Sequence, residues 1–242
     1  MDLGLRGRTA IVCGASSGMG LATAEALASE GANVAMFARR RDVLEREADR
    51  IGGLAVRGDL TVPTDLAKLV DQTVGAFGGI DILVNNGGGP PQGPAAGIDD
   101  HALEGAVELL LLSAIRLTNL CLPHLEASDR GRIVNIESSS VRSPLDGLAL
   151  SNALRPGVVG WMKTLAREVA PKGITVNTIA PGKIDTERLR STGRKDLSDV
   201  PVGRLGEPSE IAAVVCFLAS DQAGYVTGAV IPVDGGLTRN LL

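Results

Sequence analysis

The chain has 242 residues, of which 44% are hydrophobic and 21% charged, and its formal net charge is −4. This length can bury the core of one large α/β domain. The acidic balance and the 2% aromatic content argue against a nucleic-acid stacking surface, which needs basic and aromatic side chains. Uninterrupted apolar stretches such as Ile211–Ala219 are far shorter than a bilayer span, and the first residues lack the apolar core of a secretory signal. We therefore expect a cytoplasmic protein that binds neither nucleic acid nor membrane.

Short apolar segments alternate along the chain with longer segments of helical periodicity. Strands are expected at Thr9–Cys13, Asn33–Ala38, Leu54–Val56, Asp81–Asn85, Arg132–Ile136, Ile174–Ile179 and Ala229–Val233. Helices are expected at Gly18–Gly31, Thr64–Phe77, Leu103–Leu122, about Val158–Ala170 and about Glu207–Ala219. Consecutive apolar positions are typical of strands covered on both faces, and repeated strand–helix alternation indicates a parallel sheet. The chain is thus predicted to form a single domain over residues 1–242, a doubly wound α/β sheet (Rossmann fold) of about seven strands with helices on both faces.

Two irregular stretches interrupt this alternation, Gly87–Gly97 and Lys183–Pro201. Loops of this length within a domain often bind or cover a ligand, although a plain surface insertion is an equally open interpretation. The three cysteines, Cys13, Cys121 and Cys216, are widely spaced and have no CxxC pattern, so neither a metal site nor a disulfide framework is expected.

A glycine-rich turn follows the first predicted strand. It reads Gly14-Ala15-Ser16-Ser17-Gly18-Met19-Gly20 and leads directly into a predicted helix. Gly14 can make the tight turn, Gly18 can let the backbone approach a pyrophosphate, and Gly20 can allow close packing of helix and strand. The helix N-terminus adds free N–H groups and partial positive charge. An ordinary turn is the alternative, but the strand–turn–helix context favours cofactor binding.

The spacing Gly-x3-Gly-x-Gly resembles that of the short-chain dehydrogenase/reductase family, in particular its 3-oxoacyl-acyl-carrier-protein reductase branch. Asp59–Leu60 resembles an adenine-contacting pair, Asn85–Gly88 the Asn-Asn-Ala-Gly motif with Gly for Ala, and Pro181–Thr186 the segment over the nicotinamide. Gly224–Gly228 and Val233–Gly236 resemble the C-terminal signature. The resemblance implies a nicotinamide cofactor and a homodimer or homotetramer. The cofactor-binding residues that it implies are Gly14, Ser16, Ser17, Gly18, Met19, Gly20, Arg39, Arg40, Asp59, Leu60, Asn86, Gly87, Gly88, Arg155, Pro181, Gly182, Ile184 and Thr186.

The choice of cofactor depends on the charge at the end of the second predicted strand. A carboxylate there would bind the ribose 2′-hydroxyl of NAD, whereas a basic residue accommodates a 2′-phosphate. The chain reads Phe37-Ala38-Arg39-Arg40-Arg41, with no acidic residue before Asp42. Arg39 stands at the discriminating position, with Arg40 as a second ligand, because a guanidinium matches phosphate geometry. Arg41 is assigned to the solvated face that continues through Glu45, Arg46 and Arg50. NADP(H) is predicted, and NAD(H) stays possible.

The family's catalytic positions carry unusual residues in this chain. In the family a Ser polarises the carbonyl group, a Tyr supplies the proton, a Lys lowers the pKa of that Tyr and holds the ribose, and an Asn keeps a water relay. Ser138 matches the Ser, with Ser139 and Ser140 as neighbouring registers, whereas Ser151, Arg155 and Leu110 stand at the Tyr, Lys and Asn positions. The single tyrosine, Tyr225, has Ala229 four residues later and cannot restore the pattern. The predicted catalytic residues are Ser138, Ser151 and Arg155.

These replacements weaken acid catalysis in a definable way. An aliphatic hydroxyl is far less acidic than a phenol, whose pKa is about 10, and a guanidinium cannot relay protons, although it can stabilise a developing alkoxide. Losing a positioned acid costs about 10²–10⁴ in rate. Glu137 is expected to point away from Ser138 if both stay extended, toward a loop or the covering helices, and His101 and His124 are expected to be structural.

Three functions therefore remain open. The favoured one is an NADP(H)-dependent oxidoreductase with an atypical active site that transfers hydride to a carbonyl substrate, a 3-oxoacyl thioester or similar ketone, because losing one acid slows hydride transfer without forbidding it. The second is a catalytically weak or inactive NADP(H)-binding sensor. The third is a partner subunit of a hetero-oligomer, assembled through the helices about Leu103–Leu122 and Val158–Ala170.

Overall fold

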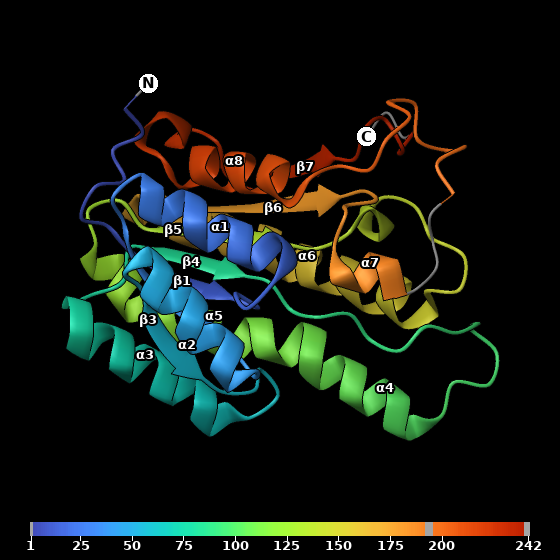
Figure 1. The fold of residues 1–242 in the computed structure, drawn as a ribbon, viewed down its shortest axis with the longest axis horizontal. Helices are drawn as coiled ribbons and strands as arrows, with labels where there is room; N and C mark the ends of the chain where they lie inside the picture. Colours follow the sequence, from blue (N-terminus) through green and yellow to red (C-terminus); the bar gives the residue numbers. More distant parts are fainter. Residues whose placement is uncertain (1, 192–195, 240–242) are drawn as a thin grey trace.

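The computed structural model describes residues 2–191 and 196–239. Its seven strands form one parallel sheet in the order β3-β2-β1-β4-β5-β6-β7 (Figure 1), with each pair of neighbours in parallel register. The strands are β1 (Thr9–Cys13), β2 (Asn33–Ala38), β3 (Leu54–Arg57), β4 (Ile82–Asn85), β5 (Arg132–Ile136), β6 (Thr175–Pro181) and β7 (Val230–Val233). The predicted Rossmann fold is confirmed. The strand order reverses between β1 and β4, and in such sheets the ligand crevice lies beyond the carboxyl ends at this point.

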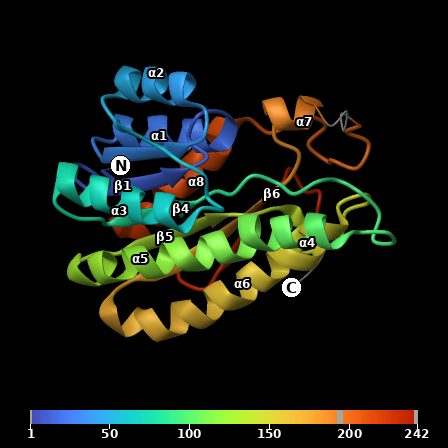
Figure 2. The same ribbon diagram turned by 90° about the horizontal axis from the view of Figure 1, so that it is seen from below.

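Helices cover both faces of the sheet (Figure 2). One face carries α1 (Gly18–Ser29), α2 (Arg41–Ile51) and α8 (Pro208–Ala219). The other carries α3 (Pro63–Phe77), α5 (Ser113–Ala127) and α6 (Ala149–Val169). Each face has its own hydrophobic cluster, which explains why central strands such as β1 are buried along their whole length.

Two helical segments differ from the sequence expectation. The helix expected at Leu103–Leu122 extends over α4 (Asp100–Ala106), a π-helical turn (Val107–Leu112) and α5. The helix expected from about Val158 begins at Ala149. Its earlier part contains Pro156, whose missing N–H ordinarily disfavours a helix interior. The local sequence therefore did not predict the first turns of this helix. This extension is important for the site because it places Ser151 and Arg155 on a helix.

The helical run from Asp100 to Ala127 is long and apolar enough to cross a membrane by length and composition alone. The sequence expectation considered uninterrupted apolar stretches only, and this run contains charged residues such as Glu104, Glu108 and Arg116. A core helix can meet the same criterion, and in this fold α5 contributes Leu117, Cys121 and Leu125 to the cluster on its face of the sheet.

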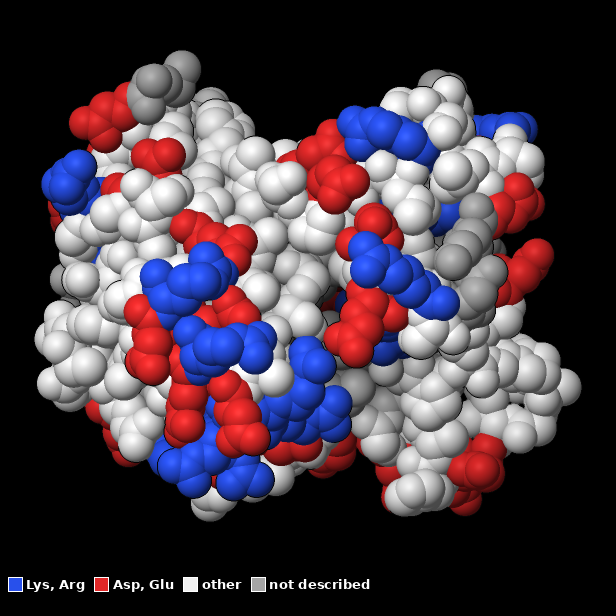
Figure 3. Space-filling view, in the orientation of Figure 1, with Lys and Arg blue, Asp and Glu red and all other residues white. Residues whose placement is uncertain are grey.

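The exposed face of α2 carries alternating charges. Nε of Arg41 donates to Oε1 of Glu45 at 2.8 Å, and Nε of Arg50 donates to Oε2 of Glu47 at 2.8 Å, so Arg41 lies on a solvated surface as expected. Figure 3 shows these charges over α2 and a hollow in the surface between α2 and the short helix α7 (Glu187–Ser191).

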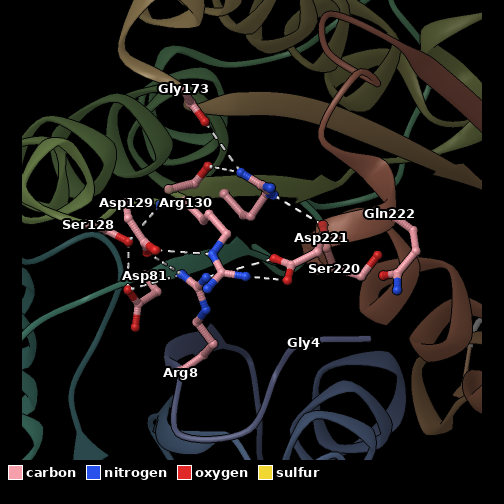
Figure 4. Close-up of polar contacts among 12 residues, drawn as sticks. Gly4, Arg8, Asp81, Ser128, Asp129, Arg130, Gly173, Ser220, Asp221 and Gln222 are labelled. Atoms are coloured by element: carbon pink, nitrogen blue, oxygen red, sulfur yellow. Dashed lines mark hydrogen bonds and ion pairs between the residues drawn. The ribbon is translucent and has the colours of Figure 1, made fainter. Parts of the chain in front are cut away.

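Charged residues also gather at the amino ends of the strands (Figure 4). We call this group the amino-edge cluster; it consists of Arg8, Asp81, Asp129, Arg130, Arg132 and Asp221. Nη1 of Arg8 lies 3.2 Å from Oδ1 of Asp129 and 3.5 Å from Oδ1 of Asp81, and its Nη2 lies 3.8 Å from Oδ1 of Asp221. Arg130 also pairs with Asp221, and Arg132 donates to the carbonyl oxygens of Ser220, Gly131 and Gly173. The cluster joins the starts of β1, β4 and β5 to the segment after α8.

Candidate active site

The glycine-rich turn lies between β1 and α1, packed against Asn86 after β4. Gly14 has a φ of 62°, and a Cβ on it would lie 2.8 Å from Nδ2 of Asn86. That amide donates to the carbonyl oxygen of Cys13 at 3.1 Å. A Cβ on Gly20 would collide with the carbonyl oxygen of Gly14. Ser17, the N-cap of α1, makes no side-chain hydrogen bond to the helix. Gly14 and Gly20 therefore allow the turn, the start of α1 and Asn86 to pack together where a side chain has no room.

Two guanidinium groups lie beside this turn, at the end of β2. Nη1 of Arg39 is 3.9 Å from Oδ2 of Asp59, and the Arg39 side chain is 79% exposed. Nη1 of Arg40 is 3.4 Å from Oε2 of Glu187, and its Nη2 is 3.5 Å from Oγ of Ser16. Arg40, the N-cap of α2, thus reaches α7 through Glu187, whereas Arg39 faces Asp59, so each cation has a carboxylate nearby.

The segment after β6 lies over the glycine-rich turn. Pro181 ends β6, and a Cβ on Gly182 would lie 2.7 Å from Cα of Asp234. Ile184 is buried, and Cγ2 of Thr186 lies 3.1 Å from the place of a Cβ on Gly18. The expected irregular stretch 183–201 includes residues 192–195, which lie outside the described residues.

Helix α7 contacts both the N-cap of α2 and the loop after β4. Glu187 pairs with Arg40, while Nη1 of Arg188 donates to the carbonyl oxygen of Gly89 at 3.0 Å and its Nη2 donates to that of Pro90 at 3.3 Å. Burial, and then the positive charge of Arg155, lowers the pKa of Arg188. Sequence reasoning missed these contacts because it treated this stretch as irregular; the adjacent charges Glu187 and Arg188 were the available signal.

Ser151 and Arg155 lie one turn apart on α6, and both are buried. The Arg155 guanidinium makes three hydrogen bonds. Its Nε donates to Oγ of Ser151 at 3.1 Å, its Nη1 to Oε2 of Glu137 at 2.8 Å, and its Nη2 to the carbonyl oxygen of Gly88 at 3.0 Å. One side chain thereby joins α6, the end of β5 and the loop after β4.

Of the three consecutive serines, Ser140 is the one that contacts Ser151. The two hydroxyl oxygens are 3.2 Å apart. Oγ of Ser138 accepts from the backbone N–H of Ser140 at 3.1 Å and caps a short 3-10 turn, Ser139–Val141. The predicted residues Ser151 and Arg155 are therefore brought into contact, whereas Ser138 lies two residues from the serine that Ser151 touches.

Glu137 faces the covering helix α6, in agreement with the expected direction, but the sequence did not predict its pairing with Arg155. Its side chain is only 8% exposed and forms an ion pair with Arg155, also 8% exposed. Burial raises the pKa of Glu137, with the charge of Arg155 opposing this effect. Strict strand alternation ends with β5 at Ile136, and the chain then turns into the 3-10 segment, so alternation could not place the next side chain. The presence of an acidic residue directly after a buried strand was the sequence feature that could have indicated a buried ion pair.

A small cavity adjoins the Glu137–Arg155 pair. Its lining includes Cys13, Leu60, Asn86, Leu110, Glu137 and Arg155. Leu110 lies in the π-helical turn, is buried and carries no ionisable group. Burial raises the pKa of the Cys13 thiol to about 12. Tyr225 is fully exposed. Across residues 2–191 and 196–239 no group of His, Cys, Asp and Glu side chains could hold a metal ion.

The chain is similar to known reductases over nearly its full length. A family profile described as enoyl-(acyl carrier protein) reductase matches residues 14–238. The 3-oxoacyl-[acyl-carrier-protein] reductase FabG of Vibrio cholerae is 37% identical over 241 residues, which cover 97% of this chain and 99% of that protein. The corresponding protein of Escherichia coli is 36% identical, with the same coverage of both chains.

Solved structures with the same fold include complexes with a nucleotide. L-sorbose reductase from Gluconobacter frateurii, complexed with NADPH and L-sorbose, superposes with a TM-score of 0.93 at 32% identity and 100% coverage of both chains. A variant of actinorhodin polyketide ketoreductase with NADPH has a TM-score of 0.91 at 32% identity, covering 96% of this chain and 98% of that one. With its parallel sheet, glycine-rich turn and full-length relatives, the chain belongs to the short-chain dehydrogenase/reductase family of oxidoreductases and is homologous to 3-oxoacyl-acyl-carrier-protein reductases.

Proposed function

We propose that this protein is an NADP(H)-dependent reductase of a carbonyl compound, a 3-oxoacyl thioester or a similar ketone, with an atypical active site. The observation that carries the proposal is the hydrogen bond of 3.1 Å from Nε of Arg155 to Oγ of Ser151. It puts a fixed cation on a hydroxyl group at the carboxyl edge of the sheet, where such folds bind ligands.

The residues present fit a phosphorylated dinucleotide. Gly14, Gly18 and Gly20 leave backbone N–H groups open to a pyrophosphate at the start of α1, and in this proposal Ser16, Ser17 and Met19 belong to the same turn. Arg39 and Arg40 would hold the 2′-phosphate, which favours NADP(H) over NAD(H).

The remaining cofactor residues would contact the two rings. Asp59 and Leu60 would lie at the adenine, while Arg155 would hold the ribose beside the nicotinamide. The segments Asn86–Gly88 and Pro181–Thr186, with Gly182 and Ile184, would enclose the nicotinamide. When bound, the cofactor supplies the hydride.

The proton in this proposal comes from Ser151. An arginine Nε is only a donor, so Oγ of Ser151 accepts in that bond and its own hydrogen can be donated to a carbonyl oxygen. The positive charge of Arg155 then stabilises negative charge that develops on Oγ. Ser138 would polarise the carbonyl group. The carbonyl carbon gains a hydride, its oxygen gains the Ser151 proton, and water restores that proton, so the product is an alcohol.

Turnover with ketones tests this function. Purified protein should oxidise NADPH in the presence of 3-oxoacyl thioesters, diketones or aldehydes, and Ser151→Ala should lower kcat. No oxidation above background with any of these compounds would overturn the proposal.

Calorimetry tests the cofactor separately. NADPH should bind more tightly than NADH, and combined replacement Arg39→Gln with Arg40→Gln should remove most of that difference. Absence of binding to either nucleotide at millimolar concentration would contradict the cofactor assignment.

A second candidate is an NADP(H)-binding protein without turnover, acting as a sensor or as a partner subunit. It is favoured by the engagement of three of the five N–H donors of Arg155 by protein oxygens. The double variant Ser151→Tyr with Arg155→Lys discriminates between the two, because strong activity gained over an inactive parent would favour the second candidate.

We also propose a homo-oligomer, a dimer or tetramer, assembled through α5 and α6. Leu120 on α5 is exposed although it is a large apolar residue. Native mass spectrometry of the purified chain gives the state, and a single-chain mass would contradict this assembly.

A further inference from the structure

The Glu137–Arg155 ion pair is the most deeply buried pair of opposite charges at the carboxyl edge of the described sheet. Both side chains are 8% exposed, and Nη1 lies 2.8 Å from Oε2. Desolvating two charges costs more than most buried pairs regain, so such a pair is weak grounds for stability by itself. The pair lines a cavity, which suggests that its role is to orient the Arg155 guanidinium there.

The geometry of the guanidinium explains how it can be oriented. The group is planar, and its donors have fixed directions. Glu137 holds Nη1 and the carbonyl oxygen of Gly88 holds Nη2. These two hydrogen bonds define the plane, and the direction of Nε follows from them. Nε then meets Oγ of Ser151 at 3.1 Å.

We propose that Glu137 is a positioning residue for the reduction: its carboxylate fixes the Arg155 guanidinium so that Nε stays on the Ser151 hydroxyl. This inference rests on the proposed function, in which Ser151 donates a proton to the substrate oxygen. Glu137 touches neither substrate nor reacting atom in this scheme, and it acts through Arg155 alone.

The charge of Glu137 and its geometry have opposite effects, which makes the proposal testable. A carboxylate near Arg155 reduces the positive potential at Ser151. If only charge were involved, Glu137→Gln and Glu137→Met would both raise kcat. If the position of the Arg155 guanidinium matters, the two variants should differ in kcat, because Gln retains an acceptor oxygen for Nη1 and Met does not.

The experiment compares kcat and KM for a carbonyl substrate in the two variants. We expect Glu137→Gln to have a kcat equal to or above that of the wild type, and Glu137→Met to lose about 10²-fold, the order that a displacement of 1 Å produces. KM should stay unchanged in both. Asp81→Asn, which removes a charge beside Arg8 in the amino-edge cluster, is the matched control and should leave kcat unchanged. Should Glu137→Met fail to fold, Glu137→Asp keeps the charge, shortens the side chain by one methylene and should also lower kcat.

Crystal structures of the two Glu137 variants provide a readout that does not need turnover. The hydrogen bond from Nε of Arg155 to Oγ of Ser151 should remain in Glu137→Gln and be broken in Glu137→Met. Equal kcat in the two variants, or an intact hydrogen bond in Glu137→Met, overturns the positioning role. Absence of turnover in the wild type, together with a broken hydrogen bond in Glu137→Met, instead overturns the proposed function and leaves the positioning of Arg155 supported.

Discussion

Two buried arginines lie at opposite ends of the same sheet, and their surroundings differ. Arg8, in the amino-edge cluster, faces three carboxylates, those of Asp81, Asp129 and Asp221. Arg155, at the carboxyl edge, faces one carboxylate, one carbonyl oxygen and the hydroxyl of Ser151. The first arginine is surrounded by compensating charge, whereas the second is aimed at a group that can give up a proton.

The contrast teaches how one residue type serves two purposes. At the amino edge, ion pairs hold together segments that begin several strands. At the carboxyl edge the same guanidinium lines a cavity at the end of the sheet where parallel folds bind ligands. Loss of the first should therefore reduce the free energy of unfolding alone, and loss of the second should reduce catalysis as well.

The largest expected effect comes from removing each arginine. Arg155→Met should lower kcat by about 10²–10³, the range for loss of a group that stabilises developing charge, and should also lower the free energy of unfolding by about 3–5 kcal/mol because Glu137 is left uncompensated. Arg8→Met should cost less free energy, because Asp129 and Asp221 are 72% and 38% exposed, and should leave kcat per folded molecule unchanged. Urea denaturation and active-site-normalised kinetics measure both. A matching loss of kcat in Arg8→Met would remove the distinction between the two edges.

A double variant separates stability from chemistry at the carboxyl edge. Replacing both charges, Glu137→Met with Arg155→Met, should restore the free energy of unfolding to the wild-type value or raise it by about 1–4 kcal/mol, as apolar replacement of buried pairs does. Activity should stay low because Ser151 no longer has a cation beside it. Recovery of kcat along with stability would show that the pair is dispensable for the reaction.

The pH dependence of stability gives a smaller effect at the same pair. Burial raises the pKa of Glu137 above its ordinary value of 4.5, so the folded state binds this proton at higher pH than the unfolded state does. The group's contribution is fully present below pH 4.5 and is lost as pH rises through the raised pKa. The free energy of unfolding of the wild type should therefore decline relative to Glu137→Gln from pH 4.5 upward in urea titrations. Parallel profiles would contradict the shift.

The smallest effect is expected for Asp129→Asn. This carboxylate is 72% exposed, and exposed ion pairs contribute little. Arg8 keeps Asp81 and Asp221 as partners, so the urea midpoint should move only slightly and kcat should not change. A loss as large as that of Arg8→Met would mean that the amino-edge cluster depends on its most exposed member.

The strands could be predicted from the sequence because their burial is continuous. The expected bounds of Thr9–Cys13, Asn33–Ala38 and Arg132–Ile136 agree with β1, β2 and β5. Helix α2 was not assigned because its exposed face is almost wholly charged, and the first turns of α6 were missed because Pro156 interrupts the local propensity. In both cases tertiary packing, not local helix propensity, determines that the segment is helical.

The candidate site could be predicted only in part. The family resemblance placed Ser151 and Arg155 four residues apart at two catalytic positions, and α6 brings their side chains into contact. Which of Ser138, Ser139 and Ser140 contacts Ser151 depends on the geometry of a 3-10 turn, which has no periodic sequence pattern. The direction of the Glu137 side chain depends on where strand alternation stops, which the sequence does not mark. Hydrogen bonds such as that of Arg188 with Gly89 join segments about a hundred residues apart, and no local pattern encodes them.

The amino-edge cluster has a consequence for how the chain matures during synthesis. Asp221 stands near the end of the chain and pairs with Arg8 and Arg130, which emerge from the ribosome far earlier. Until Asp221 has been made, Arg8 and Arg130 lack one of their counter-charges, and closing so long a loop is slow. The sheet can thus complete its amino edge only after residue 221 has been synthesised, and a chain that stops short of Asp221 should be an early substrate for proteolysis.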